Sequence, residues 1–90
     1  MPWIPASSAK KLVASQAVKL AEGETLRVES FKGDRWLEVR RSGPTLVIRE
    51  HGFRDATYEV QESEVRQLLG KLIDFEFPRS HQLRVSKSKS

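Results

Sequence analysis

The sequence predicts an α+β fold, in which a four-stranded antiparallel β-meander is followed by an amphipathic C-terminal helix. Between residues 24 and 60, apolar and polar residues alternate along four short runs, which is the period of a half-buried strand. Beyond residue 62 the apolar residues recur every three or four positions, which is the period of a helix with one buried face. We expect one domain over residues 1–78, with a short helix ahead of the sheet.

The four strand-like runs are separated by residues that favour turns. Lys32 and Gly33 follow the first run, and glycine supplies the positive φ that a tight hairpin requires. Gly43 and Pro44 follow the second run, where proline interrupts the ladder because it cannot donate a backbone hydrogen bond. The runs cover residues 24–31, 34–41, 45–53 and 56–60.

The C-terminal helix is expected over residues 63–76. Ser63 is the expected N-cap, and Glu62 and Glu64 lie near the positive end of the helix dipole. Pro78 ends the helix. The helix should place Val65, Leu68, Leu69, Leu72 and Ile73 on the sheet face formed by Leu26, Val28, Leu37, Val39, Leu46, Ile48, Tyr58 and Val60.

The two ends of the chain are less clearly patterned. Residues 8–21 place apolar side chains on one helical stripe, with Gly23 as a possible C-cap, and we favour a helix there. Residues 17–20 could instead form a strand paired with the first run across Gly23. Residues 79–90 combine basic residues with four serines, which is typical of a flexible basic tail.

Composition restricts the compartment and the chemistry. The chain has no cysteine, so disulfides and thiolate metal sites are absent. Its first residues lack the apolar segment of a signal peptide, and no stretch approaches the roughly 20 apolar residues that span a bilayer. We therefore expect a soluble cytoplasmic protein without a membrane partner. The absence of asparagine and the single methionine also resemble the composition of thermophile proteins.

Charge is unevenly distributed along the chain. The net charge is +4, yet residues 22–76 contain nine basic and twelve acidic residues. The excess of positive charge therefore lies at the two ends. Basic ends suit an anionic partner, and they equally suit solubilising tails.

Trp36 lies on the wrong side of its strand for the aliphatic core. It alternates with Leu37, so it belongs to a second sheet face that also carries basic residues. Aromatic rings that stack on unpaired bases, beside arginines that neutralise phosphates, are typical of single-stranded nucleic-acid binding. The candidate nucleic-acid-binding residues are Arg27, Phe31, Lys32, Trp36, Arg40, Arg49, His51 and Phe53.

A structural interpretation of the same face is also open. The aromatic residues and Val47 could form a second core under the N-terminal helix or against another subunit. Arginines 27, 40 and 49 could then pair across strands with glutamates 38, 29 and 59.

Residues 35–41, a glycine turn and residues 46–50, followed by a short strand and an amphipathic helix, resemble a known family. This pattern is similar to the single-stranded-DNA-binding domain of the transcriptional coactivator positive cofactor four and its bacterial relatives, over about residues 24–75. The resemblance implies a homodimer that holds single-stranded DNA with basic and aromatic residues of a curved sheet. It assigns Trp36 and Arg40 to the strand before the hairpin, and Arg49 and His51 to the strand after it.

A second register of this resemblance aligns Phe31-Lys32-Gly33 with an aromatic-Lys-Gly turn of the family. The two registers exclude each other. The chain also departs from the family after Arg54, where Asp55-Ala56 replaces a basic segment that contains glycine.

The sequence carries no pattern of catalytic residues. The two histidines have no metal-site spacing, and Glu50 and His51 point to opposite faces of one strand. No glycine-rich phosphate loop is present. We expect no enzyme activity, no cofactor, no metal and no small-molecule substrate. The expected partners are single-stranded DNA, with RNA as a variant, and a second copy of the chain, and DNA binding would place the protein at the nucleoid. The alternative function is a non-catalytic protein-interaction or scaffold module.

Overall fold

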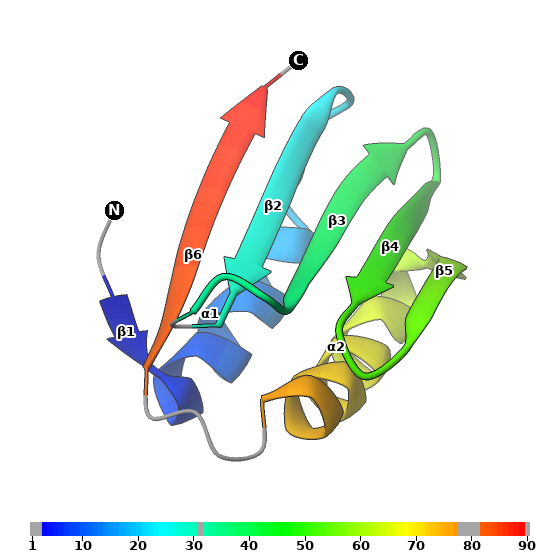
Figure 1. The fold of residues 1–90 in the computed structure, drawn as a ribbon. Helices are drawn as coiled ribbons and strands as arrows, with labels where there is room; N and C mark the ends of the chain where they lie inside the picture. Colours follow the sequence, from blue (N-terminus) through cyan, green and yellow to red (C-terminus); the bar gives the residue numbers. More distant parts are fainter. Residues whose placement is uncertain (1–2, 31, 78–81, 90) are drawn as a thin grey trace.

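A computed structural model describes residues 3–30, 32–77 and 82–89. These residues form a six-stranded antiparallel sheet with two helices, in the strand order β1-β6-β2-β3-β4-β5 (Figure 1). The α+β class and the antiparallel meander are confirmed, whereas the expected number of four strands is wrong. The elements are β1 (Trp3–Pro5), α1 (Ala6–Ala17), β2 (Glu24–Glu29), β3 (Trp36–Ser42), β4 (Thr45–His51), β5 (Asp55–Gln61), α2 (Glu62–Glu76) and β6 (Gln82–Lys89).

The connections of the meander follow the glycines. Gly43 has a φ of 62° and, with Pro44, closes β3 onto β4. The β2–β3 connection is longer than the expected tight turn, because β2 ends at Glu29. Gly33 has the expected positive φ of 74°. The loop is closed next to the two strand ends, where the Ser30 amide donates to the Arg35 carbonyl at 2.9 Å.

Both helices pack on the same face of the sheet and leave the other face uncovered by described residues (Figure 1). The expected sheet face is buried, apart from Tyr58 and Val60, which are partly exposed. The expected stripe of α2 is buried with it, and only Leu68 remains partly exposed. The N-terminal helix is confirmed as α1, and its residues Ala9, Val13 and Ala17 join the same core. A second core between α1 and the opposite face is therefore excluded.

The N-cap of helix α2 lies two residues earlier than expected. Gln61, not Ser63, is the N-cap residue, and it forms a capping box with Glu64. The exchange satisfies two backbone amides at once, which a single serine cap does not do. The first turn of α2 then follows β5 without an intervening loop.

Arg41 fixes the end of α1 to the sheet. Its guanidinium donates to the carbonyl oxygens of Leu20 at 2.9 Å and Val18 at 3.0 Å, just beyond the helix. It also lies 3.6 Å from the carboxylate of Glu62 at the start of α2. A cation at the negative end of α1 satisfies carbonyls that the helix leaves without partners.

The C-terminal segment is a strand rather than the expected flexible tail. β6 lies between β1 and β2 and pairs with both of them. Leu83 is fully buried and Val85 partly buried, so the segment has a period of 2 that its lysines and serines obscure in the sequence. Residues 79–81 and 90 lie outside the described residues.

We expect Leu83→Ala to destabilise the protein by about 2–5 kcal/mol, because it removes a fully buried side chain from the core. Urea unfolding followed by circular dichroism measures the loss. Ser88→Ala, at an exposed position of the same strand, is the matched control and should leave the midpoint unchanged. An unchanged midpoint for Leu83→Ala would show that β6 does not form part of the core.

Candidate nucleic-acid interface

The sheet face opposite the helices carries polar, charged and aromatic side chains, and we call it the open face. It arises from strand alternation, because each of its residues follows or precedes a buried core residue. On the three central strands it consists of Thr25, Arg27, Glu29, Trp36, Glu38, Arg40, Val47, Arg49 and His51, and Arg84 and Ser86 of β6 continue it across the sheet.

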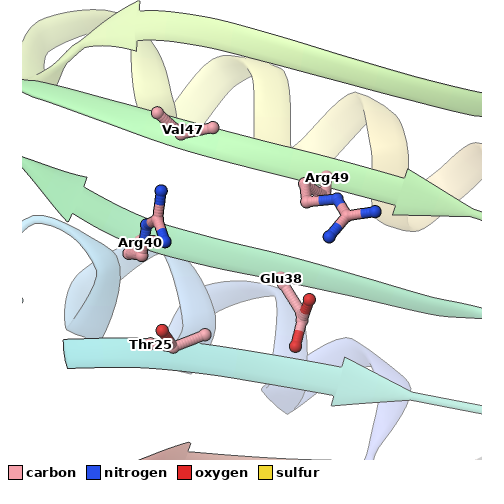
Figure 2. A pocket seen from close by; sticks show the side chains of 5 residues that line it. All are labelled: Thr25, Glu38, Arg40, Val47 and Arg49. Carbon is pink, nitrogen blue, oxygen red and sulfur yellow. The ribbon is translucent and has the colours of Figure 1, made fainter. Parts of the chain in front are cut away.

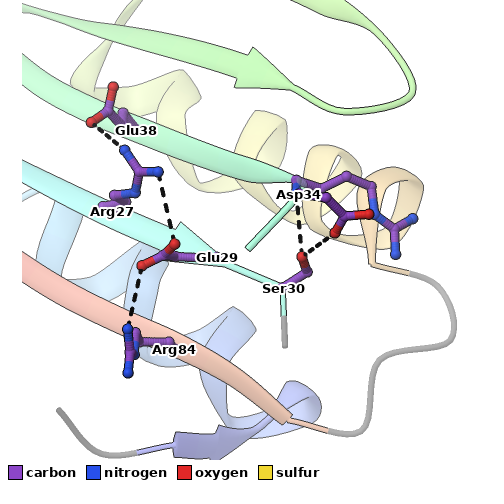
Figure 3. Close-up of polar contacts among 7 residues, drawn as sticks. Arg27, Glu29, Ser30, Asp34, Glu38 and Arg84 are labelled. Carbon is purple, nitrogen blue, oxygen red and sulfur yellow. Dashed lines mark hydrogen bonds and ion pairs between the residues drawn. The ribbon is translucent and has the colours of Figure 1, made fainter. Parts of the chain in front are cut away.

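A chain of ion pairs crosses one side of the open face (Figure 3). Arg27 lies 3.3 Å from the carboxylate of Glu38 and 3.8 Å from that of Glu29. Arg84 of β6 lies 4.0 Å from the other oxygen of Glu29. The cross-strand pairing proposed for Arg27 is therefore present, and these charges largely neutralise one another. Arg84 is not among the residues predicted for this face, because residues 79–90 were expected to form a flexible tail.

The Trp36 ring stands among side chains of the two neighbouring strands. The Arg27 guanidinium carbon lies 4.6 Å from the ring centroid, and that of Arg49 lies at 5.8 Å. The His51 ring stacks against it with centroids 5.1 Å apart and an interplanar angle of 20°. His51 is held on its other side by an ion pair to Asp55 at 3.5 Å when the imidazole is protonated. Trp36 is thus the centre of an aromatic and cationic cluster on the open face.

A shallow depression of about 180 Å³ lies beside this cluster (Figure 2). Arg40 and Arg49 project into it from adjacent strands. Glu38 lies directly opposite Arg49 in the strand pairing, but its carboxylate forms its ion pair with Arg27 of β2. Both arginines are exposed, and within the described residues neither forms an ion pair with a carboxylate. The cross-strand pairing expected for these two arginines is therefore wrong. Two guanidinium groups in one depression, neither paired with a carboxylate of the described residues, are suited to binding an anion.

Phe53 does not lie on the open face, contrary to the prediction. Strand β4 ends at His51, so the alternation no longer applies two residues later. The Phe53 ring instead packs edge-to-face against Phe75 of α2 at 6.0 Å, and the Arg35 guanidinium lies 4.7 Å from its centroid. Phe53 is 65% exposed and forms a separate aromatic patch at the end of the sheet.

One of the other two candidates, Lys32, belongs to the β2–β3 loop. Lys32 is exposed in the loop and is not a member of the open face. Phe31 lies outside the described residues. The Ser30 hydroxyl donates a hydrogen bond to the Asp34 carboxylate at 2.9 Å (Figure 3), and this bond lowers the pKa of Asp34. The structure therefore brings Arg27, Trp36, Arg40, Arg49 and His51 together on the open face.

A buried carboxyl group fixes the turn that carries Phe53. Glu76 is fully buried and accepts hydrogen bonds from the backbone amides of Phe53 at 2.9 Å and Arg54 at 3.3 Å. Gly52 lies so close that a Cβ there would collide with the Glu76 carboxylate and stand 2.7 Å from Cγ of Arg35. This contact requires glycine, although the backbone conformation does not. No sequence pattern marks Glu76, which lies on an otherwise apolar helix stripe.

Glu76 interacts with a second buried carboxyl group, Glu50. Burial raises the pKa of Glu76, and a hydrogen bond to Glu50 raises it further. Burial also opposes ionisation of Glu50, but hydrogen bonds from Glu76 and from the Tyr58 hydroxyl, at 2.7 Å, leave the pKa of Glu50 lowered. The same hydrogen bond raises the pKa of Tyr58. Within the pair, Glu50 therefore ionises at a lower pH than Glu76.

The comparisons with known proteins identify no relative. No protein-family model matches the chain, and no curated protein and no solved structure is significantly similar to it. The described residues contain no cluster of three or more histidine or acidic side chains that could hold a metal ion. Among the same residues, neither helix has the length and apolarity needed to cross a membrane.

The Glu76 pKa predicts a pH dependence of stability. A raised folded-state pKa contributes stability that is complete below the ordinary value of 4.5 and is lost as pH rises through the folded-state pKa. Glu76→Gln cannot titrate, so the stability of the wild type relative to this variant should fall as the pH rises above 4.5. The lowered pKa of Glu50 costs stability only when the pH falls below the ordinary glutamate pKa of 4.5. The glutamine that replaces Glu76 can still donate a hydrogen bond to the Glu50 carboxylate. Urea unfolding at several pH values measures the difference, and a constant difference would contradict the raised pKa of Glu76.

Proposed function

We propose that the chain is a small, non-catalytic single-stranded nucleic-acid-binding protein, with single-stranded DNA as its preferred ligand, acting in transcription, replication or repair. The observation that carries the proposal is the pair of exposed arginines, Arg40 and Arg49, in the depression of the open face. Their guanidinium groups have no carboxylate partner among the described residues, so an incoming phosphate replaces no ion pair. Such a protein acts in the cytoplasm, at the nucleoid.

Trp36 supplies the aromatic surface next to the phosphate site. Its ring already contacts Arg27 and His51, so a base reaches it only by replacing one of them. His51 is the easier one to replace, because its side chain is 48% exposed and, within the described part of the chain, its only ion pair is with the exposed Asp55. Arg27 is held by two glutamates. The base therefore stacks on Trp36 in the place of His51.

A protein-interaction or scaffold role for the open face is the second candidate. The observation that favours it is the same cluster, because Arg27 and His51 cover the Trp36 ring without a ligand. In that role the open face buries Trp36 against a partner protein. Arg40 and Arg49 then make no contribution to a salt-dependent binding of nucleic acid.

The phosphate site predicts a defined salt dependence. For single strands, the logarithm of affinity changes with the logarithm of salt concentration by about −0.7 per phosphate contacted. Arg40→Gln combined with Arg49→Gln should therefore flatten the slope for oligothymidine by roughly 1.4. Fluorescence anisotropy at several salt concentrations measures it, with duplex DNA and single-stranded RNA as competitors.

Arg66→Gln is the matched control for this experiment. Arg66 is an exposed arginine of α2, on the helical side of the sheet, so its removal should leave the slope unchanged. Equal slopes for the wild type and the double variant would remove Arg40 and Arg49 from the site. Stronger competition by duplex DNA would show that the ligand is not a single strand.

Trp36 and His51 should differ in their effect on affinity. Trp36→Ala should weaken oligothymidine binding by roughly 5- to 150-fold, the equivalent of one stacked base at about 1–3 kcal/mol. His51→Ala should leave the affinity unchanged or increase it, because it removes the group that a base must replace. A loss of affinity in His51→Ala equal to that in Trp36→Ala would contradict this arrangement, and thermal unfolding checks that both variants fold.

A further inference from the structure

Strand β5 is an edge of the sheet that is open to another strand. Among the described residues it pairs only with β4, and the pairing runs residue for residue without a bulge. Its seven residues include no proline and no lysine, which are common means of blocking an edge. The opposite edge, β1, has only three residues and ends at Pro5. Of the two edges, β5 therefore has the longer free backbone.

The core is also incompletely covered at β5. No side chain of this strand is fully buried, whereas β2 and β3 each contain fully buried residues. Ala56, Tyr58 and Val60 face the helices but remain partly exposed, and Leu68 of α2 beside them is partly exposed as well. Another strand on this edge would remove more of this apolar surface from water.

We propose that two copies of the chain associate through β5, in an antiparallel pair centred on Tyr58, so that one sheet continues across both copies. In this register Tyr58 lies opposite the partner's Tyr58, and Val60 lies opposite the partner's Ala56. On the open face, Thr57 lies opposite the partner's Glu59. Asp55 lies opposite the partner's Gln61. Apolar residues thus meet apolar residues, and each acidic residue meets an uncharged one.

Charge selects this register over its neighbours. A pair centred on Thr57 would place Asp55 opposite the partner's Glu59. A pair centred on Glu59 would place the Glu59 side chains of the two copies opposite each other. Like charges directly opposite each other destabilise a strand pair. The register centred on Tyr58 avoids both contacts and pairs all seven residues of the strand.

The association goes beyond the proposed nucleic-acid binding and does not depend on it. Both helices lie on one face of the sheet, so a two-fold pairing of β5 strands places the two open faces on the same side of one continuous sheet. The depression formed by Arg40 and Arg49 is then present twice on that side.

The register is tested by four proteins compared by sedimentation equilibrium: the wild type, Thr57→Lys, Glu59→Lys and the double variant. Thr57→Lys creates two opposite-charge pairs with Glu59 of the partner subunit and should tighten the dimer roughly 2- to 30-fold. The double variant places lysine opposite lysine and should raise the dissociation constant of the dimer by a similar factor. Glu59→Lys alone should have little effect. Any repulsion between a lysine at 57 and Arg49 of its own chain occurs in monomer and dimer alike.

Gln67→Lys, at an exposed position of α2, is the control for added charge and should leave the dissociation constant unchanged. Hydrogen exchange should also show that the amides of β5 become more protected as protein concentration rises. The inference is overturned by equal dissociation constants in all four proteins, or by a Thr57→Lys protein that stays monomeric at the highest concentration reached. In the second case the edge is left for a strand of a different chain. Oligothymidine binding by such a monomer would show that the proposed function stands without the dimer.

Discussion

The structure depends on the burial of one sheet face by two helices. The fully buried residues of β2, β3 and β4 point toward α1 and α2, and this asymmetry leaves the opposite face to polar and aromatic side chains. Arg41 links this layer to the sheet, because one guanidinium binds the chain after α1 and pairs with the start of α2. Burial of the aliphatic face provides the stability, and the alternation of the strands then determines which residues remain for a ligand.

The central part of this arrangement follows from the sequence. Alternation predicted the core residues of three strands, and helical spacing predicted the stripe of α2, because burial imposes a strict period on each element. The open-face cluster around Trp36 followed from the same rule. The alternation rule fails at Phe53, because it applies only within a strand and β4 ends two residues earlier, at His51.

Other features could not be derived from local pattern. β6 has the composition of a solvated tail, and only its partners β1 and β2, distant in sequence, make it a strand. The long-range contact of Glu76 with the turn at Gly52 leaves no mark in the sequence either, since a glutamate on a helix is normally exposed. That Arg40 and Arg49 form no ion pair with a carboxylate among the described residues is likewise a matter of three-dimensional geometry, because suitable glutamates are available in the sequence.

The position of β6 has a consequence for how the protein is made. This strand follows all the other described elements in the sequence, yet it joins β1 to the rest of the sheet, and β1 pairs with no other strand among the described residues. During synthesis, residues 82–89 leave the ribosome after all the other elements. Until then β2 presents an unpaired edge and part of the core lacks Leu83, so the nascent chain remains open to wrong strand pairing until β6 has been synthesised.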